Sequence, residues 1–165
     1  MKKGIIFSII FICLFLQNSI FSQDDIVAVE SKFVLNNAVT SSDVLTQFGE
    51  PDEKSKEELM EADGCLYQNW YYRSKGLEIS FCRDQNKTQL VGNISIYSPS
   101  ELKTSKGIGI GSSKAEVLKA YKKEIDPKNK WGGPDIIVAG SEFGGLIFDI
   151  KDGKVSSIFI GAAAE

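Results

Sequence analysis

The 165-residue sequence contains no histidine. This absence excludes Ser-His-Asp and Cys-His catalysis, metal ligation by imidazole and a histidine pH switch. Cysteine is also scarce: only Cys13, Cys65 and Cys82 occur, and no two of them have the Cys-x-x-Cys spacing of redox motifs. We therefore predict a protein that is not an enzyme and that carries no metal and no cofactor.

Motifs for nucleotides and calcium are missing as well. Gly107, Gly109 and Gly111 alternate along the chain, but Ser112 stands where a dinucleotide-binding loop needs its third glycine. The acidic residues near the C-terminus do not follow the spacing of a calcium-binding loop. We expect the three glycines to form a turn that leads into a helix.

The only long apolar run lies at the N-terminus. Lys2 and Lys3 precede apolar residues 4–16, and small or polar residues lead to Ser22. This order is typical of a secretory signal peptide, and the run is shorter than the ~20 residues that span a bilayer. Cys13 lies inside the apolar run rather than after it, so we expect no lipidation. We predict cleavage after Ser22 and an exported protein, periplasmic or secreted, with no membrane span after removal of the leader.

Residues 23–165 contain 17 basic and 22 acidic residues, which gives a formal net charge of −5. This acidic balance argues against nucleic acid and anionic membrane surfaces as partners, because phosphate binding depends on clustered lysine and arginine. The nearest candidate for such a cluster is Lys122, Lys123, Lys128 and Lys130, interrupted by acidic residues. We interpret it as the solvated end of a helix.

A helix followed by three strands is predicted for the first half of the chain. Thr40 and Asp43 are residues that begin helices, and Gly49 ends this one. The charged run 53–63 is predicted to be a solvated helix or a loop. Aromatic and β-branched residues then predict an antiparallel meander with strands near 66–72, 77–83 and 90–97.

Alternation along these strands assigns their two faces. The residues assigned to the core side are Leu66, Trp70, Tyr72, Leu77, Ile79, Phe81, Leu90, Ile94 and Ile96. The opposite face carries Tyr67, Asn69, Tyr71, Glu78, Ser80, Asn93, Ser95 and Tyr97. Tyrosine with serine and asparagine is typical of recognition surfaces, so these eight residues are our candidate partner-binding set. The alternative is the ordinary polar outer face of an antiparallel sheet.

Cys65 and Cys82 are predicted to form a disulfide on this same face. Removal of the leader would remove Cys13 and leave two cysteines, and an even number of cysteines in an exported chain favours a bridge. A turn near Ser74 pairs odd-numbered residues of one strand with even-numbered residues of the next, so residues 65 and 82 are opposite or diagonal neighbours. The bridge would make the candidate face more rigid.

The same pattern recurs in the second half. Ser113 and Glu116 have the spacing of a helix capping box, and three further strands are predicted near 136–139, 146–150 and 155–160. We therefore predict an α+β fold of two tandem α-β-β-β repeats, with the helices packed on one face of antiparallel meander sheets. The predicted organisation is signal peptide 1–22, lead-in segment 23–39, first repeat 40–98, connector 99–111 and second repeat 112–165.

This tandem plan, with a helix start before Val44-Leu45 and again before Val117-Leu118, resembles the β-lactamase-inhibitor protein and its BamE/SmpA-type relatives over residues 40–162. The stretch 103–121 carries the most family-like residues. The resemblance implies a protein-binding surface on the exposed face of the sheet. The chain lacks the lipidation cysteine of the BamE type, which sets it apart from outer-membrane assembly.

These observations predict a non-catalytic exported binding module that engages a protein partner, as an inhibitor or an envelope assembly factor does. The alternatives are a small exported hydrolase or ligand-binding protein with a cleft between the two repeats, and a purely structural envelope protein. The identity of the partner and the oligomeric state are not predicted by the sequence.

Overall fold

The structure is a computed structural model that describes residues 26–27, 34–36, 38–61, 63–83, 88–129 and 131–162. The predicted signal peptide 1–22, much of the lead-in segment and residues 84–87 lie outside the described residues. No helix among the described residues is long and apolar enough to cross a membrane.

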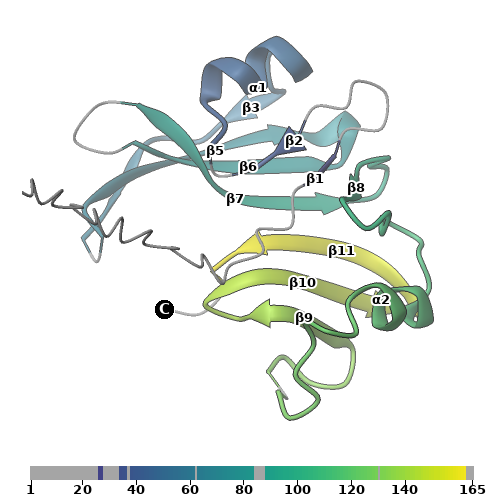
Figure 1. Ribbon diagram of the computed structural model, residues 1–165. Coiled ribbons are helices and arrows are strands. Elements are labelled where there is room, and N and C mark those ends of the chain that lie inside the picture. Colours follow the sequence, from purple (N-terminus) through teal and green to yellow (C-terminus); the bar gives the residue numbers. More distant parts are fainter. Residues whose placement is uncertain are drawn as a thin grey trace, which may run out of the picture.

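Two helices and eleven strands make up the described part of the chain (Figure 1). The helices are α1 (Ser41–Phe48) and α2 (Lys114–Ala120), with a short 3-10 turn η1 (Arg73–Lys75). The strands before residue 100 are β1 (Ile26–Val27), β2 (Val34–Leu35), β3 (Glu53–Lys54), β4 (Glu58–Met60), β5 (Cys65–Tyr72), β6 (Leu77–Arg83) and β7 (Gln89–Tyr97). Those after it are β8 (Lys103–Thr104), β9 (Ile136–Ser141), β10 (Gly144–Lys151) and β11 (Lys154–Gly161).

One antiparallel sheet of eight strands dominates the structure. Its order is β3-β5-β6-β7-β11-β10-β9, and β4 also pairs with β5. β7 pairs with β11, with Ile96 opposite Ile158, so the strands that follow α1 and those that follow α2 form one continuous sheet. β1, β2 and β8 form a separate sheet of three short strands. The α+β class and the antiparallel sheet are thus confirmed, whereas the interpretation of the two halves as repeats stays a prediction.

Both helices begin where the sequence predicts, and for the predicted reason. Thr40 Oγ1 accepts the backbone N–H of Asp43, whose carboxylate accepts the N–H of Thr40 at 3.0 Å. Ser113 and Glu116 make the same reciprocal pair at the start of α2. The hydrogen bonds lower the pKa of Asp43 and of Glu116, because each carboxylate accepts N–H and O–H donors in its charged form.

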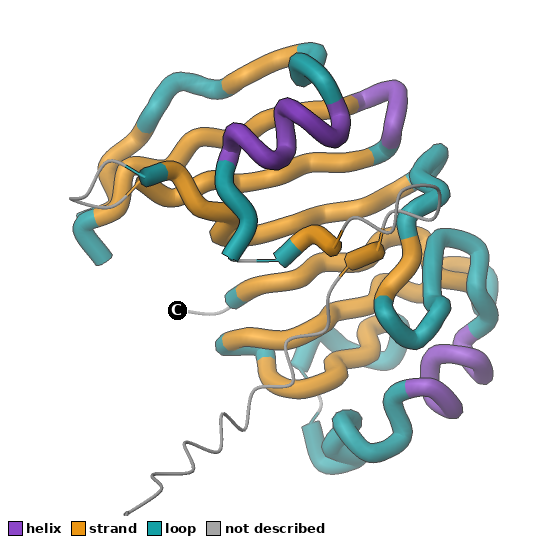
Figure 2. The backbone as a smooth tube through the Cα atoms, turned by 45° about the horizontal axis from the view of Figure 1, so that its top comes forward, coloured by secondary structure: helices purple, strands orange, loops and turns teal. Residues whose placement is uncertain are grey.

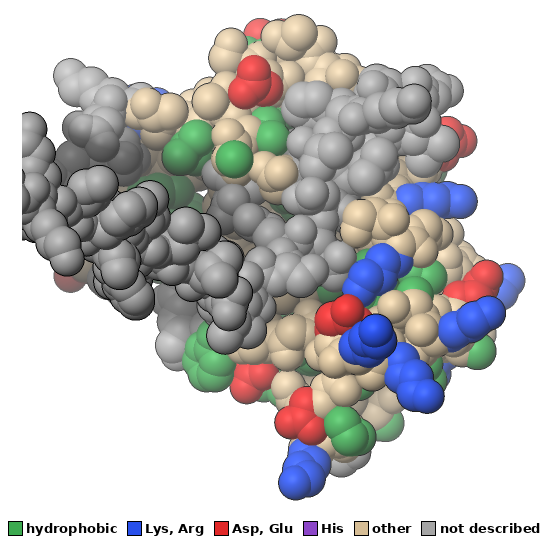
Figure 3. Space-filling view, in the orientation of Figure 1, with side chains coloured by type: hydrophobic (Ala, Val, Ile, Leu, Met, Phe, Trp, Pro, Cys, Tyr) green, Lys and Arg blue, Asp and Glu red, His purple; other side chains and the backbone are tan. Residues whose placement is uncertain are grey.

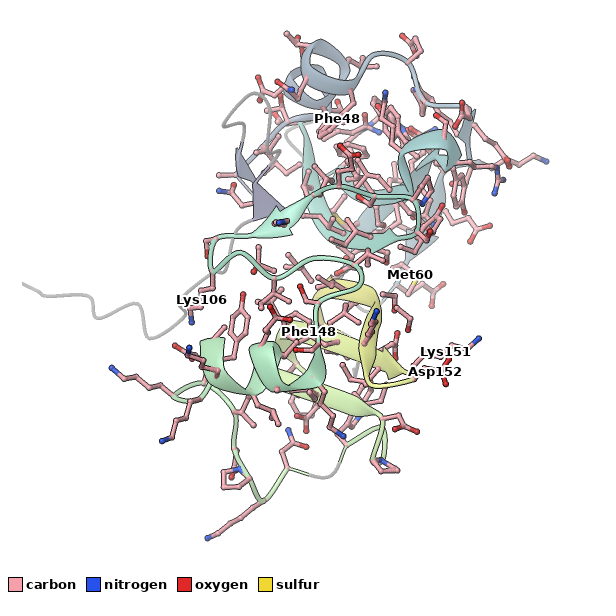
Figure 4. All side chains as sticks on the ribbon, turned by 90° about the vertical axis from the view of Figure 1, so that its right-hand side faces the viewer. Phe48, Met60, Lys106, Phe148, Lys151 and Asp152 are labelled. Carbon is pink, nitrogen blue, oxygen red and sulfur yellow. A yellow bond between two sulfur atoms is a disulfide. The ribbon has the colours of Figure 1, made fainter. Side chains whose placement is uncertain are left out.

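A single hydrophobic core contains residues of both helices and of the large sheet. Figure 2 shows the two helices against the strands of the sheet. Phe48 of α1 packs on Tyr72 with ring centroids 5.9 Å apart, and Tyr121 after α2 packs on Phe148 at 5.1 Å. Figure 4 shows Phe48 below α1 and Phe148 beside α2, one in each half of the core. Burial raises the pKa of Tyr72 to about 12, and Glu50 contributes to the rise.

Two sequence predictions need correction. Leu90 was expected in the core, but Val91 takes that position at 3% exposure, while Leu90 stands opposite Cys82. The cause is a β-bulge: Ser80 pairs with Asn93 and Phe81 pairs with Val91, so Gly92 is an extra residue in β7. Because of this extra residue, Val91 and Leu90 point to the opposite faces from those that simple alternation predicts.

The charged run 53–63 was expected to be a solvated helix or a loop. Instead it contributes β3 and β4, both paired with β5. Every side chain of these two short strands is exposed, so the sequence shows no alternation there. Pairing with the edge of β5 decides their conformation.

Candidate functional site

The candidate site is the face of the large sheet opposite the two helices, which we call the outer face. Strand register places all eight predicted residues on it. Tyr71 pairs with Glu78, which pairs with Ser95; Asn69 pairs with Ser80, which pairs with Asn93. Tyr67 lies opposite Cys82, and Tyr97 ends β7 on the same side. All eight side chains are half-buried, as expected for a sheet face on which neighbouring side chains cover one another.

The predicted disulfide is present between Cys65 and Cys82, with Cα atoms 5.6 Å apart. Since Tyr67 is the direct partner of Cys82, Cys65 is its diagonal neighbour. Cys65 is 6% exposed, so the bridge is shielded at the end of the outer face that lies beside β4. It fixes the relative position of β5 and β6, the two strands that carry five of the eight candidate residues.

Tyrosines on the outer face are held by specific contacts. The Tyr67 hydroxyl donates to Asp63 at 2.8 Å. The ring of Tyr67 lies over Gly92, where a Cβ added to the glycine would be 3.4 Å from the ring. The Arg73 guanidinium lies 5.2 Å from the centroid of Tyr71 and forms an ion pair with Glu53. These contacts hold the aromatic rings of Tyr67 and Tyr71 in place on the outer face.

Glu78 is the charged residue of the predicted set, and it lies between Tyr71 and Ser95 on the outer face. Desolvation raises its pKa, and the nearby Arg73 partly offsets the rise. None of the described residues donates a hydrogen bond to its carboxylate. A partly desolvated carboxylate between Tyr71 and Ser95 is suited to a cationic or N–H donor from outside the chain.

The outer face continues beyond the predicted residues because β7 pairs with β11. Ser95 lies opposite Phe159, which lies opposite Ile147, which pairs with Val138. This row of residues is therefore apolar on β11, β10 and β9 and polar on β7. Ile147 and Val138 are 5% and 6% exposed, whereas Phe159 is half-buried.

A second row of paired residues also runs from β7 across β11 to β10. Tyr97 lies opposite Ser157, and the Ser157 hydroxyl donates to the Asp149 carboxylate on β10. Alternation within β10 and β11 would have placed Ile147, Asp149, Ser157 and Phe159 on one face. Sequence reasoning missed their connection to the candidate residues because the pairing of β7 with β11 joins segments about 60 residues apart, and no local pattern predicts it.

The outer face offers hydroxyls, amides, two carboxylates and aromatic rings. One of its hydroxyls, that of Ser157, donates to one of its carboxylates, that of Asp149. Within the described ranges, no three cysteine, aspartate or glutamate residues are grouped so as to hold a metal ion.

Comparison with known proteins adds no relative. No protein-family model, no curated protein and no solved structure matches the chain.

Proposed function

We propose that this protein is an exported, non-catalytic binding module that engages a protein partner through the outer face of its large sheet. The observation that supports the proposal is the register of β5, β6 and β7, which gathers three tyrosines with asparagine and serine side chains on one face. Such residues combine large contact area with adaptable hydrogen bonds. An inhibitor and an envelope assembly factor are the two kinds of role that fit.

The two halves of the outer face suggest how a partner is recognised. Phe159 provides apolar contact area at the centre of the sheet, and Glu78 and the tyrosines lie on the adjoining strands. An apolar centre with polar groups around it is the usual arrangement of a protein interface. The disulfide supports the proposed export, because such bridges persist in oxidising compartments.

The test is affinity capture from the envelope fraction with the wild type and with the variant Tyr71→Ala plus Tyr97→Ala. A partner that uses the outer face should be retained by the wild type and lost from the variant, since each tyrosine at an interface centre contributes about 2 kcal/mol or more. The control is Ser42→Ala plus Glu101→Ala, two exposed residues away from the sheet. Equal retention by wild type and tyrosine variant would show that the proposed face is wrong.

The alternative of a small exported hydrolase or ligand-binding protein stays a prediction. Asp149 with Ser157 is the polar pair that this alternative would use first. Turnover of a chromogenic ester or glycoside that Asp149→Asn abolishes would favour the alternative.

A further inference from the structure

Large apolar side chains are exposed at two places that carry opposite charge. Exposed Leu59 (60%) and Met60 (39%) lie in β4, and exposed Leu118 (43%) and Trp131 (37%) lie in α2 and the loop that follows it. Phe143 is also exposed, in the turn between β9 and β10. Exposed apolar residues grouped with charges of one sign are a common feature of interaction surfaces.

The first of these places is acidic, and we call it the acidic hairpin: Glu57, Glu58, Leu59, Met60, Glu61 and Asp63. Arg83 pairs with Glu57, and Asp63 accepts the hydroxyl of Tyr67. Glu58 and Glu61 have no ion-pair partner among the described residues. β4 pairs only with β5, so it forms an open edge of the sheet, where another chain is free to approach.

The second place is basic, and we call it the basic α2 surface: Leu118, Lys119, Lys122, Lys123, Lys128 and Trp131. Val117 and Tyr121 are buried, so helical geometry turns Leu118, Lys119 and Lys122 toward solvent. Figure 3 shows lysine side chains gathered around α2, in the lower right of the view.

Among the described residues, the charge of the lysines of this surface is only partly balanced: Lys106 and, to a smaller extent, Lys123 lower the pKa of Glu124. Where an acidic residue is close enough, an ion pair forms, as between Lys106 and Glu124 at 2.8 Å. None of the four lysines of the basic α2 surface forms such a pair within the described part of the chain. Glu116 is held in the capping box, and Asp126 accepts the backbone N–H of Lys128.

The loop after α2, which carries Trp131, is tied to the helix by a hydrogen bond. Lys114 Nζ donates to the carbonyl oxygen of Pro134 at 3.1 Å. This bond holds the end of the loop that carries Trp131 beside the first turn of α2, one turn before Leu118. The basic α2 surface therefore includes two exposed apolar side chains, as the acidic hairpin does.

One molecule cannot join its own two surfaces. In Figure 1 the turn between β4 and β5 lies at the left of the view, and α2 lies at the right. The acidic hairpin of one molecule can, however, contact the basic α2 surface of another molecule. A contact between two different surfaces of identical chains is heterologous, and it repeats from one molecule to the next.

We propose that the protein associates head to tail, with the acidic hairpin of one molecule docked on the basic α2 surface of a second copy. The apolar pair Leu59 and Met60 then contacts Leu118 and Trp131, and Glu58 and Glu61 face the unpaired lysines. The complementary charge favours a second copy over other occupants, since the chain itself supplies both surfaces. The proposal does not involve the outer face, so it stands or falls independently of the proposed function.

Sedimentation equilibrium of the purified protein at low salt tests the association. The wild type should form oligomers that grow with concentration and dissociate in 0.5 M NaCl, because exposed charge pairs are screened. Neutralising the basic surface with Lys119→Gln, Lys122→Gln and Lys123→Gln should lower the association constant about tenfold. Neutralising the hairpin with Glu58→Gln and Glu61→Gln should lower it by a similar factor.

A mixing experiment separates this contact from nonspecific charge effects. Each neutralised variant keeps one intact surface, so an equimolar mixture should form a 1:1 dimer and nothing larger. The control variant Lys75→Gln plus Lys151→Gln removes two exposed lysines from elsewhere and should associate like the wild type. Matching urea midpoints establish that all variants are folded.

Three results would overturn the proposal. The first is a wild type that stays monomeric up to about 1 mM at low salt, because the dissociation constant would then lie above that concentration. The second is association of the neutralised variants equal to that of the control. The third is a mixture that forms no heterodimer.

Discussion

Removal of the bridge between Cys65 and Cys82 should destabilise the protein without unfolding it. The bridge closes a loop with a sequence separation of 17 residues. In the chain-entropy model, a closed loop of this length lowers the entropy of the unfolded chain enough to stabilise the fold by about 3 kcal/mol. The native register does not depend on the bridge, because β5 and β6 are paired along their full length from Leu66 to Tyr72. We therefore expect Cys65→Ala plus Cys82→Ala to fold with a free energy of unfolding lower by about 2 to 4 kcal/mol.

Urea unfolding followed by tryptophan fluorescence measures this loss, since Trp70 lies in the core. The wild type with a reducing agent should lose the same free energy, and the variant should be insensitive to the reducing agent. A loss below about 1 kcal/mol would refute the loop-entropy reasoning. Two free thiols in the exported protein, detected by mass spectrometry under non-reducing conditions, would refute the bridge itself.

Three further predictions concern local structure. Thr40→Ala and Ser113→Ala should each lower the free energy of unfolding by about 1 kcal/mol, because each removes the oxygen that caps a helix, and urea titration measures both. Gly76→Ala should lower the free energy of unfolding by about 2 kcal/mol or more, because Gly76 has φ +56° and a Cβ there would lie 2.0 Å from a backbone oxygen of β7. The control is Gly107→Ala, at φ +80° with open space around it, which should lower the free energy of unfolding less in the same titration. The raised pKa of Tyr72 means that the folded state holds its proton more tightly than the unfolded chain, so stability should fall as the pH rises from about 10 toward 12. Thermal unfolding across this range should show the fall in the wild type and a weaker one in Tyr72→Phe; equal slopes would contradict the assignment.

Local sequence patterns were sufficient for most elements of the fold. The capping residues at Thr40 and Ser113 located both helices, and the observed strands β5, β6 and β7 agree with the predicted ranges to within one residue. Parity about a turn near Ser74 predicted that Cys65 and Cys82 are opposite or diagonal neighbours and form a disulfide, which the structure contains. These features depend on residues close in sequence, where propensity and alternation act directly.

The candidate site was predicted only in its first half. All eight predicted residues share the outer face, yet Phe159, Ser157 and Asp149 extend it through the pairing of β7 with β11. The bulge at Gly92 was also missed, because an extra residue in a strand leaves the residue types on either side unchanged while reversing the direction of their side chains.

By itself, the sequence determined where both helices and the strands β5, β6 and β7 lie and which two cysteines pair, because each of these depends on interactions between neighbours or across one short turn. The tertiary structure alone decided that the strands that follow α1 and those that follow α2 join into one sheet, that β3 and β4 extend its edge, and that the acidic hairpin and the basic α2 surface lie at different places on the molecule. These outcomes depend on contacts between residues far apart in the chain. Their free energy is gained only after the intervening segments have folded, so no local pattern records them.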